Sequence, residues 1–139
     1  MDAPHLRAYP VYTVIAEKFH AMVELGINNS RMKDFFDLAV IARTSTLDGT
    51  ILIRALRATF AQRGTTLPAA TPVALTPEFA ATAAKARQWD AFVSKARLQA
   101  NDLREVVALL DTFLDLPIKA ATSDQPFDSK WDPALRRWT

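Results

Sequence analysis

Apolar residues recur at helical spacing through most of the chain, and this pattern predicts about five α-helices. Each expected helix carries one apolar stripe, which is how a helix packs against a core. The expected helices cover residues 12–25, 31–43, 49–62, 77–97 and 102–116. The chain shows no strand-like pattern between these ranges, so we expect no strands.

Residues that begin and end helices occur at the boundaries of these ranges. Gly26 can adopt the left-handed conformation that closes a helix, and Ser30 can accept the free amides that open the next one. The other expected signals are Asp48, Thr76–Pro77 and Asp102 with Glu105 at helix starts, and Gly64 and Pro117 at helix ends.

Three segments lack a helical period. Residues 1–10 contain two prolines and are expected to be an extended lead-in, and residues 65–75 are a proline-containing linker. The tail is polar and aperiodic but holds large aromatic residues. We expect Phe127 and Trp131 to pack back onto the helices, because free tails rarely expose such side chains.

These expectations define an all-α fold, an irregular bundle with an extended N-terminal lead-in and a C-terminal aromatic tail. The whole chain, 1–139, is expected to be a single helical domain, in which 11–116 form the helical core and 117–139 pack on it. The ragged start of the lead-in suggests a truncated gene or a fragment cut from a longer protein.

Composition excludes several functional classes. Half of the 139 residues are hydrophobic and 23% are charged, as in an ordinary globular protein, and a net charge of +2 is too weak to indicate nucleic-acid binding. With no cysteine and two histidines, disulfides are ruled out and a structural zinc site is not expected. No signal peptide or membrane-spanning run is visible, so we expect a cytoplasmic protein without membrane contact.

Charged residues stand out within the two helices expected at the N-terminal end. Lys18 lies on the first, and Arg31, Lys33, Asp34 and Asp37 lie on the second, which is otherwise apolar nearly all round. Acids on such a helix need a cation, a donor or a solvent-filled cleft, because unpaired buried carboxylates are costly. Asp37 is expected to face a site while Asp34 pairs with Arg31.

Spacing alone permits two interpretations of this cluster. Ordinary ion pairs such as Lys18–Asp34 could lock a helical hairpin, and such structural networks are more common than active sites. Alternatively, Lys18 and one aspartate line a site for a phosphate-bearing ligand, because lysine pairs with phosphate and aspartate is a ligand of magnesium.

The other polar candidates favour a structural interpretation. His20 lies near Glu17 and Glu24 and is expected to be a surface histidine with acidic neighbours rather than a general base. Arginines at 54, 57 and 63 share one helical segment and could meet phosphate or RNA, but a solvated helix face is the more common meaning of such a pattern.

The segments TVIAEKFHAMVELG and NSRMKDFFDL resemble two motifs of the AbiEii/AbiGii toxin family of nucleotidyltransferases. This bacterial family lies within the DNA-polymerase-β-like nucleotidyltransferase superfamily and usually supplies the toxin of a toxin–antitoxin pair. ATFAQRGTTLP and the helix with Trp89 and Phe92 are also similar, so the resemblance extends over most of the chain.

The resemblance implies a function for the charge cluster. In such enzymes a nucleotidyl group passes from an NTP, with Mg²⁺, to an acceptor that is tRNA in relatives. The motif lysine, Lys18 here, is thought to contact the nucleotide phosphates, with Arg31 and Lys33 as further nucleotide-binding candidates. Asp34 and Asp37 would be the catalytic candidates that complete the site. No residue of this chain is expected to ligate a metal on its own.

Two family motifs are missing from this sequence. It contains neither the Gly-Ser pair nor the Asp-x-Asp-like metal-binding motif of the nucleotidyltransferase core. The resemblance therefore implies the C-terminal helical part of the enzyme, inactive alone and with no tightly bound Mg²⁺ or NTP. Its partner would be the missing N-terminal domain, and apolar surface left uncovered there would favour homo-oligomers.

A second function remains open at this point. The chain could be a stand-alone helical interaction module that binds an antitoxin or another partner protein, with purely structural ion pairs. An in-frame coding segment carrying GS and DxD motifs upstream of Met1 would favour the enzyme instead.

Overall fold

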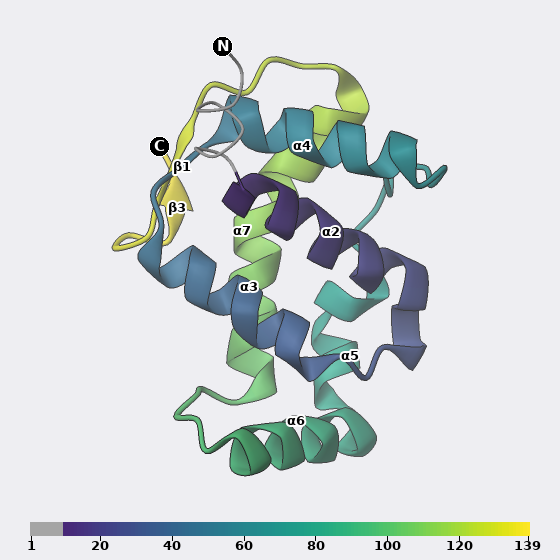
Figure 1. Cartoon of the computed structure of the whole chain (residues 1–139), viewed down its shortest axis with the longest axis vertical. Coiled ribbons are helices and arrows are strands. Elements are labelled where there is room, and N and C mark those ends of the chain that lie inside the picture. The colour runs from purple at the N-terminus through teal and green to yellow at the C-terminus, as the bar shows by residue number, and fades with distance from the viewer. Residues whose placement is uncertain (1–9) are drawn as a thin grey trace.

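The computed structural model describes residues 10–139, which form a mostly helical fold (Figure 1). The α-helices are α2 (Pro10–Leu25), α3 (Met32–Thr44), α4 (Gly49–Gln62), α5 (Pro77–Ala81), α6 (Ala83–Ala96) and α7 (Leu103–Ser123). Two 3-10 turns, η1 (Gly26–Asn28) and η2 (Val73–Leu75), lie between them. The helical fold class is confirmed, whereas the expected extended lead-in falls, apart from Pro10, outside the described residues.

Helix α7 lies at the centre of the fold. Helices α3, α4 and α5 pack against it, and α2 packs mainly on α4. Figure 1 shows α4 across one end of α7 and α6 at the opposite end. The apolar stripes predicted from the sequence meet in this core, with fully buried side chains at Ile15, Phe19, Phe35, Leu38, Leu52, Leu56, Leu110, Phe113 and Leu114.

The N-terminal helices begin and end close to the expected residues, with one wrong cap. Gly26 has φ of 53°, the left-handed conformation expected after α2. Asp48 accepts a hydrogen bond from the Thr50 amide at 2.9 Å and caps α4 as predicted. The Ser30 cap is wrong, because Arg31 holds the cap position of α3 without a side-chain capping bond, and the Asn29 side chain accepts the Arg31 amide at 2.8 Å in the turn before the helix.

The helix expected over residues 77–97 is two helices. Thr76 caps α5 as predicted, but Thr82 has an extended backbone with ψ of 140° and separates α5 from α6. The Thr82 hydroxyl donates to the Phe79 carbonyl at 3.1 Å and accepts from the Lys85 amide at 3.3 Å. It therefore ends one helix and begins the next, a role that the helical apolar period did not indicate.

Replacing the cap of α6 should have a measurable cost. We expect Thr82→Ala to lower the free energy of unfolding by about 1 kcal/mol, because it removes the acceptor of the Lys85 amide. Thr82→Asn should lose less, since asparagine also caps well. Urea unfolding of both variants tests this, and equal losses would show that the hydroxyl does not act as a cap.

Helix α7 continues through Pro117 instead of ending there. Proline has no amide hydrogen, so the carbonyl of Phe113, four residues earlier, lacks its helical partner. The indole Nε1 of Trp138 donates to that carbonyl at 2.9 Å. The tail thus supplies the hydrogen bond that the proline removes. The predicted helix end was wrong because the prediction considered the residues of this helix alone.

The tail also supplies strands that the sequence did not predict. β2 (Lys130–Asp132) pairs antiparallel with β1 (Leu47–Asp48) and with β3 (Arg137–Trp138) in a three-stranded sheet. Strands of two or three residues are too short to show an alternating pattern. The prediction that Phe127 and Trp131 pack back is confirmed, with Trp131 fully buried and Phe127 partly buried against Trp138.

Candidate functional site

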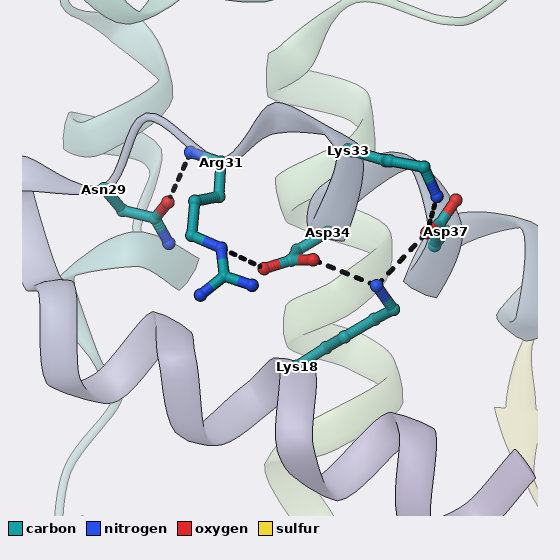
Figure 2. Close-up of polar contacts among 6 residues, drawn as sticks. All are labelled: Lys18, Asn29, Arg31, Lys33, Asp34 and Asp37. Atoms are coloured by element: carbon teal, nitrogen blue, oxygen red, sulfur yellow. Dashed lines mark hydrogen bonds and ion pairs between the residues drawn. The ribbon is translucent and has the colours of Figure 1, made fainter.

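The turn between α2 and α3 brings the predicted charged residues together. Lys18 projects from α2, while Lys33, Asp34 and Asp37 lie on the first turns of α3 and Arg31 precedes that helix. Helix α3 follows α2 after the short turn η1, so charged residues of one helix can face those of the other. Figure 2 shows all five side chains converging on one region.

Lys18 bridges both aspartates. Its Nζ lies 2.9 Å from Asp34 Oδ1 and 3.1 Å from Asp37 Oδ2 (Figure 2). On the far side, Lys33 Nζ approaches Asp37 Oδ2 at 2.7 Å. The convergence of the ammonium group and the acids, on which the sequence interpretation depended, is confirmed as a set of contacts.

Arg31 pairs with Asp34, as the sequence suggested. Its Nε lies 3.1 Å from Asp34 Oδ2, but the angles are not those of a hydrogen bond. The side chain of Asp34 is only 6% exposed, whereas that of Arg31 is 59% exposed. Among residues 10–139, no acceptor engages the two terminal nitrogens of the Arg31 guanidinium. This donor fork is therefore open to solvent beside a buried acid.

The contacts change the pKa values of two groups in the cluster. Partial burial would lower the pKa of Lys18, but the hydrogen bonds and charges of Asp34 and Asp37 outweigh it and raise this pKa above its ordinary value. Partial burial would likewise raise the pKa of Asp37, yet the hydrogen bonds and charges of Lys33 and Lys18 lower it. Both shifts favour the charged forms at neutral pH.

The composition of the cluster suits an anion better than a metal ion. Lys18, Arg31 and Lys33 carry three positive charges against the two carboxylates of Asp34 and Asp37, which leaves one positive charge. Both carboxylates already meet cations, and within the described part of the chain no group of three His, Cys, Asp or Glu residues could hold a metal ion.

An open groove of about 830 Å³ runs along the outer face of α2 beside the cluster. Lys18, Arg31 and Asp34 line it near the start of α3, and Arg63 lines it near the end of α4. Arg63 forms an ion pair with Glu17 at 2.7 Å and remains solvated, with its side chain 54% exposed, while it lines the groove. No local signal predicts a pair between residues so distant in the sequence.

His20 lies at the edge of the same groove but is not a surface residue. It is buried, its Nε2 lies 2.9 Å from the Thr65 hydroxyl, and its ring meets the edge of Phe60 at 5.1 Å. The expectation of a surface position was wrong because the loop after α4 folds over the imidazole. Arg57 also has a structural contact, donating to the carbonyls of Ala120 and Ala121 near the end of α7.

The fold and the site define a helical protein with a braced cationic cluster at the edge of an open groove. The chain matches the family described as nucleotidyl transferase AbiEii toxin, type IV toxin–antitoxin system, over residues 1–128. It therefore belongs to the AbiEii nucleotidyltransferase toxin family, as its motifs suggested. Neither the curated proteins nor the solved structures contain a significant match.

Family membership carries general implications. Nucleotidyltransferases act on nucleoside triphosphates with a metal ion, and the toxin of a toxin–antitoxin system has an antitoxin as its partner. Among the helices of residues 10–139, none is both long enough and apolar enough to cross a bilayer.

Proposed function

We propose that this chain is the C-terminal helical part of an AbiEii-type nucleotidyltransferase and contributes a phosphate-binding wall to its active site. The intact enzyme transfers a nucleotidyl group from an NTP to an RNA acceptor. The support is the family match together with the absence of Gly-Ser and Asp-x-Asp motifs in this sequence. The chain alone is then inactive.

The open guanidinium of Arg31 carries this proposal. Two terminal nitrogens of a planar guanidinium match two oxygens of one phosphate group. They lie in the groove next to Lys18, whose ammonium group adds a second positive charge. Lys33 extends the positive field from the exposed side of Asp37. An NTP triphosphate placed here would meet three cations, each of which is already paired with an aspartate of the cluster.

The two aspartates have different roles in this proposal. Asp34 is buried and holds Lys18 and Arg31 in place, so it orients the cations. Asp37 is more exposed and orients Lys18 or the acceptor. Bound Mg²⁺ supplies charge neutralisation to such enzymes. In this proposal the metal-binding carboxylates belong to the catalytic core, because Lys18, Arg31 and Lys33 already contact Asp34 and Asp37.

Calorimetric titration with inorganic tripolyphosphate, and then with NTP and Mg²⁺, tests the phosphate site. We expect Lys18→Met and Arg31→Gln each to weaken tripolyphosphate binding about tenfold, the equivalent of one charge-assisted contact. Lys119→Met is the matched control, because Lys119 also pairs with an aspartate but lies on α7, away from the groove. It should bind like the wild type.

Equal and negligible heats for all variants would contradict nucleotide binding by this part of the enzyme. They would leave family membership untouched. The DNA upstream of the Met1 codon tests the other half of the proposal, since an in-frame segment with GS and DxD motifs is expected there.

An alternative function is a helical interaction module for an antitoxin or another partner protein. The observation in its favour is apolar exposure beside the groove, where Val14 and Leu25 of α2 are both more than a third exposed. Such a module would retain its partner when Lys18 is replaced by Met. Loss of tripolyphosphate binding without loss of the partner would assign both functions to separate parts of this face.

A further inference from the structure

We infer that Lys85 of α6 is a positioning residue for the phosphate site, acting through Asn29 on Arg31. This inference rests on the proposed function, because it names a residue that prepares the same site without touching the ligand. Lys85 lies on α6, the helix that also carries Trp89 and Phe92, and no member of the cluster lies on this helix.

Lys85 is a buried lysine whose partners are not carboxylates. It is only 7% exposed, its Nζ donates to the Asn29 carbonyl at 2.6 Å, and the same atom lies 5.3 Å from the centre of the Phe79 ring. Burying an ammonium group is costly when no acid pairs with it. An apolar side chain would leave the buried Asn29 carbonyl without this donor, so a lysine at this position holds the turn at Asn29.

Asn29 transmits the contact to Arg31. Asn29 is fully buried, and its side-chain Oδ1 accepts the backbone amide of Arg31 at 2.8 Å (Figure 2). Its Nδ2 finds no hydrogen-bond partner in the described part of the chain. Asn29 therefore acts through two acceptor oxygens: its backbone carbonyl accepts from Lys85, and its side-chain Oδ1 accepts from the Arg31 amide.

Arg31 directly follows the turn that contains Asn29. It occupies the cap position of α3 with φ of −85° and ψ of 69°, at the centre of a tight turn in which the Met32 amide donates to the Ser30 carbonyl at 2.9 Å, and its own side chain makes no capping bond. The side chain instead runs toward Asp34 and the groove (Figure 2). Lys85 holds the backbone carbonyl of Asn29, two residues before Arg31, and the Asn29 side chain holds the Arg31 amide, so we expect the position of Arg31 to depend on both contacts.

A double-mutant cycle on the full chain tests this coupling. We expect Lys85→Met to weaken tripolyphosphate binding about tenfold in the wild-type background but less than about twofold in the Arg31→Gln background. Lys95→Met is the matched control, an exposed lysine on the same helix, and should change nothing. An equal loss in both backgrounds would overturn the inference, because Lys85 would then act independently of Arg31.

Asn29→Ala provides a second route if Lys85→Met folds poorly. It keeps the backbone carbonyl that Lys85 binds but removes the acceptor of the Arg31 amide, so it should weaken binding as much as Lys85→Met. Hydrogen exchange of the Arg31 amide, measured by NMR without ligand, should be slow in the wild type and fast in both variants. Unchanged exchange in the two variants would overturn the inference that Lys85 acts through Asn29 on Arg31.

These readouts separate the inference from the function on which it rests. If wild-type protein bound no tripolyphosphate, the proposed phosphate site would fail. The Arg31 amide would still show whether Lys85 and Asn29 position this residue.

Discussion

Replacing Trp131 with alanine should lower the free energy of unfolding by about 4 kcal/mol, one of the two largest effects we expect in this chain. Trp131 has no exposed surface, and its ring meets Phe113 of α7 at 4.9 Å and Trp138 at 5.5 Å. Its indole Nε1 also donates to the Ala42 carbonyl of α3 at 2.7 Å. The substitution removes a large core side chain and a buried hydrogen bond together.

Equilibrium unfolding in urea measures this effect, with two comparisons. Trp131→Phe keeps a ring against Phe113 but loses the bond to Ala42, so it should cost about 1–2 kcal/mol. Leu135→Ala alters the turn between β2 and β3, where the leucine is 57% exposed, and should stay within about 0.5 kcal/mol of the wild type. A loss for Trp131→Ala no larger than for Leu135→Ala would show that the sheet is not part of the core.

This expectation gives the C-terminal hairpin a definite role. The family match ends at residue 128, whereas both tryptophans of the hairpin come after it. The chain leading to the hairpin also fits closely, because a Cβ on Gly49 would approach the Phe127 ring to 2.5 Å. We therefore regard residues 130–138 as an integral part of this helical fold, including the compensation that Trp138 provides at Pro117.

The sequence predicted the helices well because their apolar stripes and caps are local signals. The start of α4 at Asp48 and the left-handed Gly26 followed from single residues and their immediate neighbours. At two positions where the prediction was wrong, a distant segment decided the outcome. Pro117 stays helical because of Trp138, and His20 is buried because the loop with Thr65 covers it. Periodicity does not contain such contacts.

The candidate site likewise combines residues that local sequence signals indicate with a residue that only a distant contact reveals. Lys18, Asp34 and Asp37 could be singled out because charges on an otherwise apolar helix require partners, and the turn between the helices brings those partners together. The contribution of Lys85 could not be found in this way. Its partner is a backbone carbonyl 56 residues away, and because every residue has a backbone carbonyl, the sequence does not indicate which one accepts a hydrogen bond.

Replacing Lys18 with methionine should lower the free energy of unfolding by about 2–3 kcal/mol at neutral pH, the other large effect. Removing one partner of a buried ion pair costs about 3–5 kcal/mol, and the partial exposure of Lys18 together with the remaining contact of Asp34 to Arg31 reduces this. Lys119→Met removes an exposed pair of the same type on α7 and should cost less than about 1 kcal/mol.

The difference between wild type and Lys18→Met should depend on pH in a defined way. The pKa of Asp37 is lowered in the folded protein, so its contribution is complete above the ordinary value of 3.8 and is lost as pH falls through the folded value. The pKa of Lys18 is raised, so its contribution is complete below 10.5 and is lost as pH rises through the folded value. Urea unfolding across this range should therefore show a plateau between about pH 5 and 9 and convergence of the two proteins at both ends. A difference that stays constant into strong acid would mean that methionine acts through packing at this position, and that the ammonium and the acids do not stabilise each other.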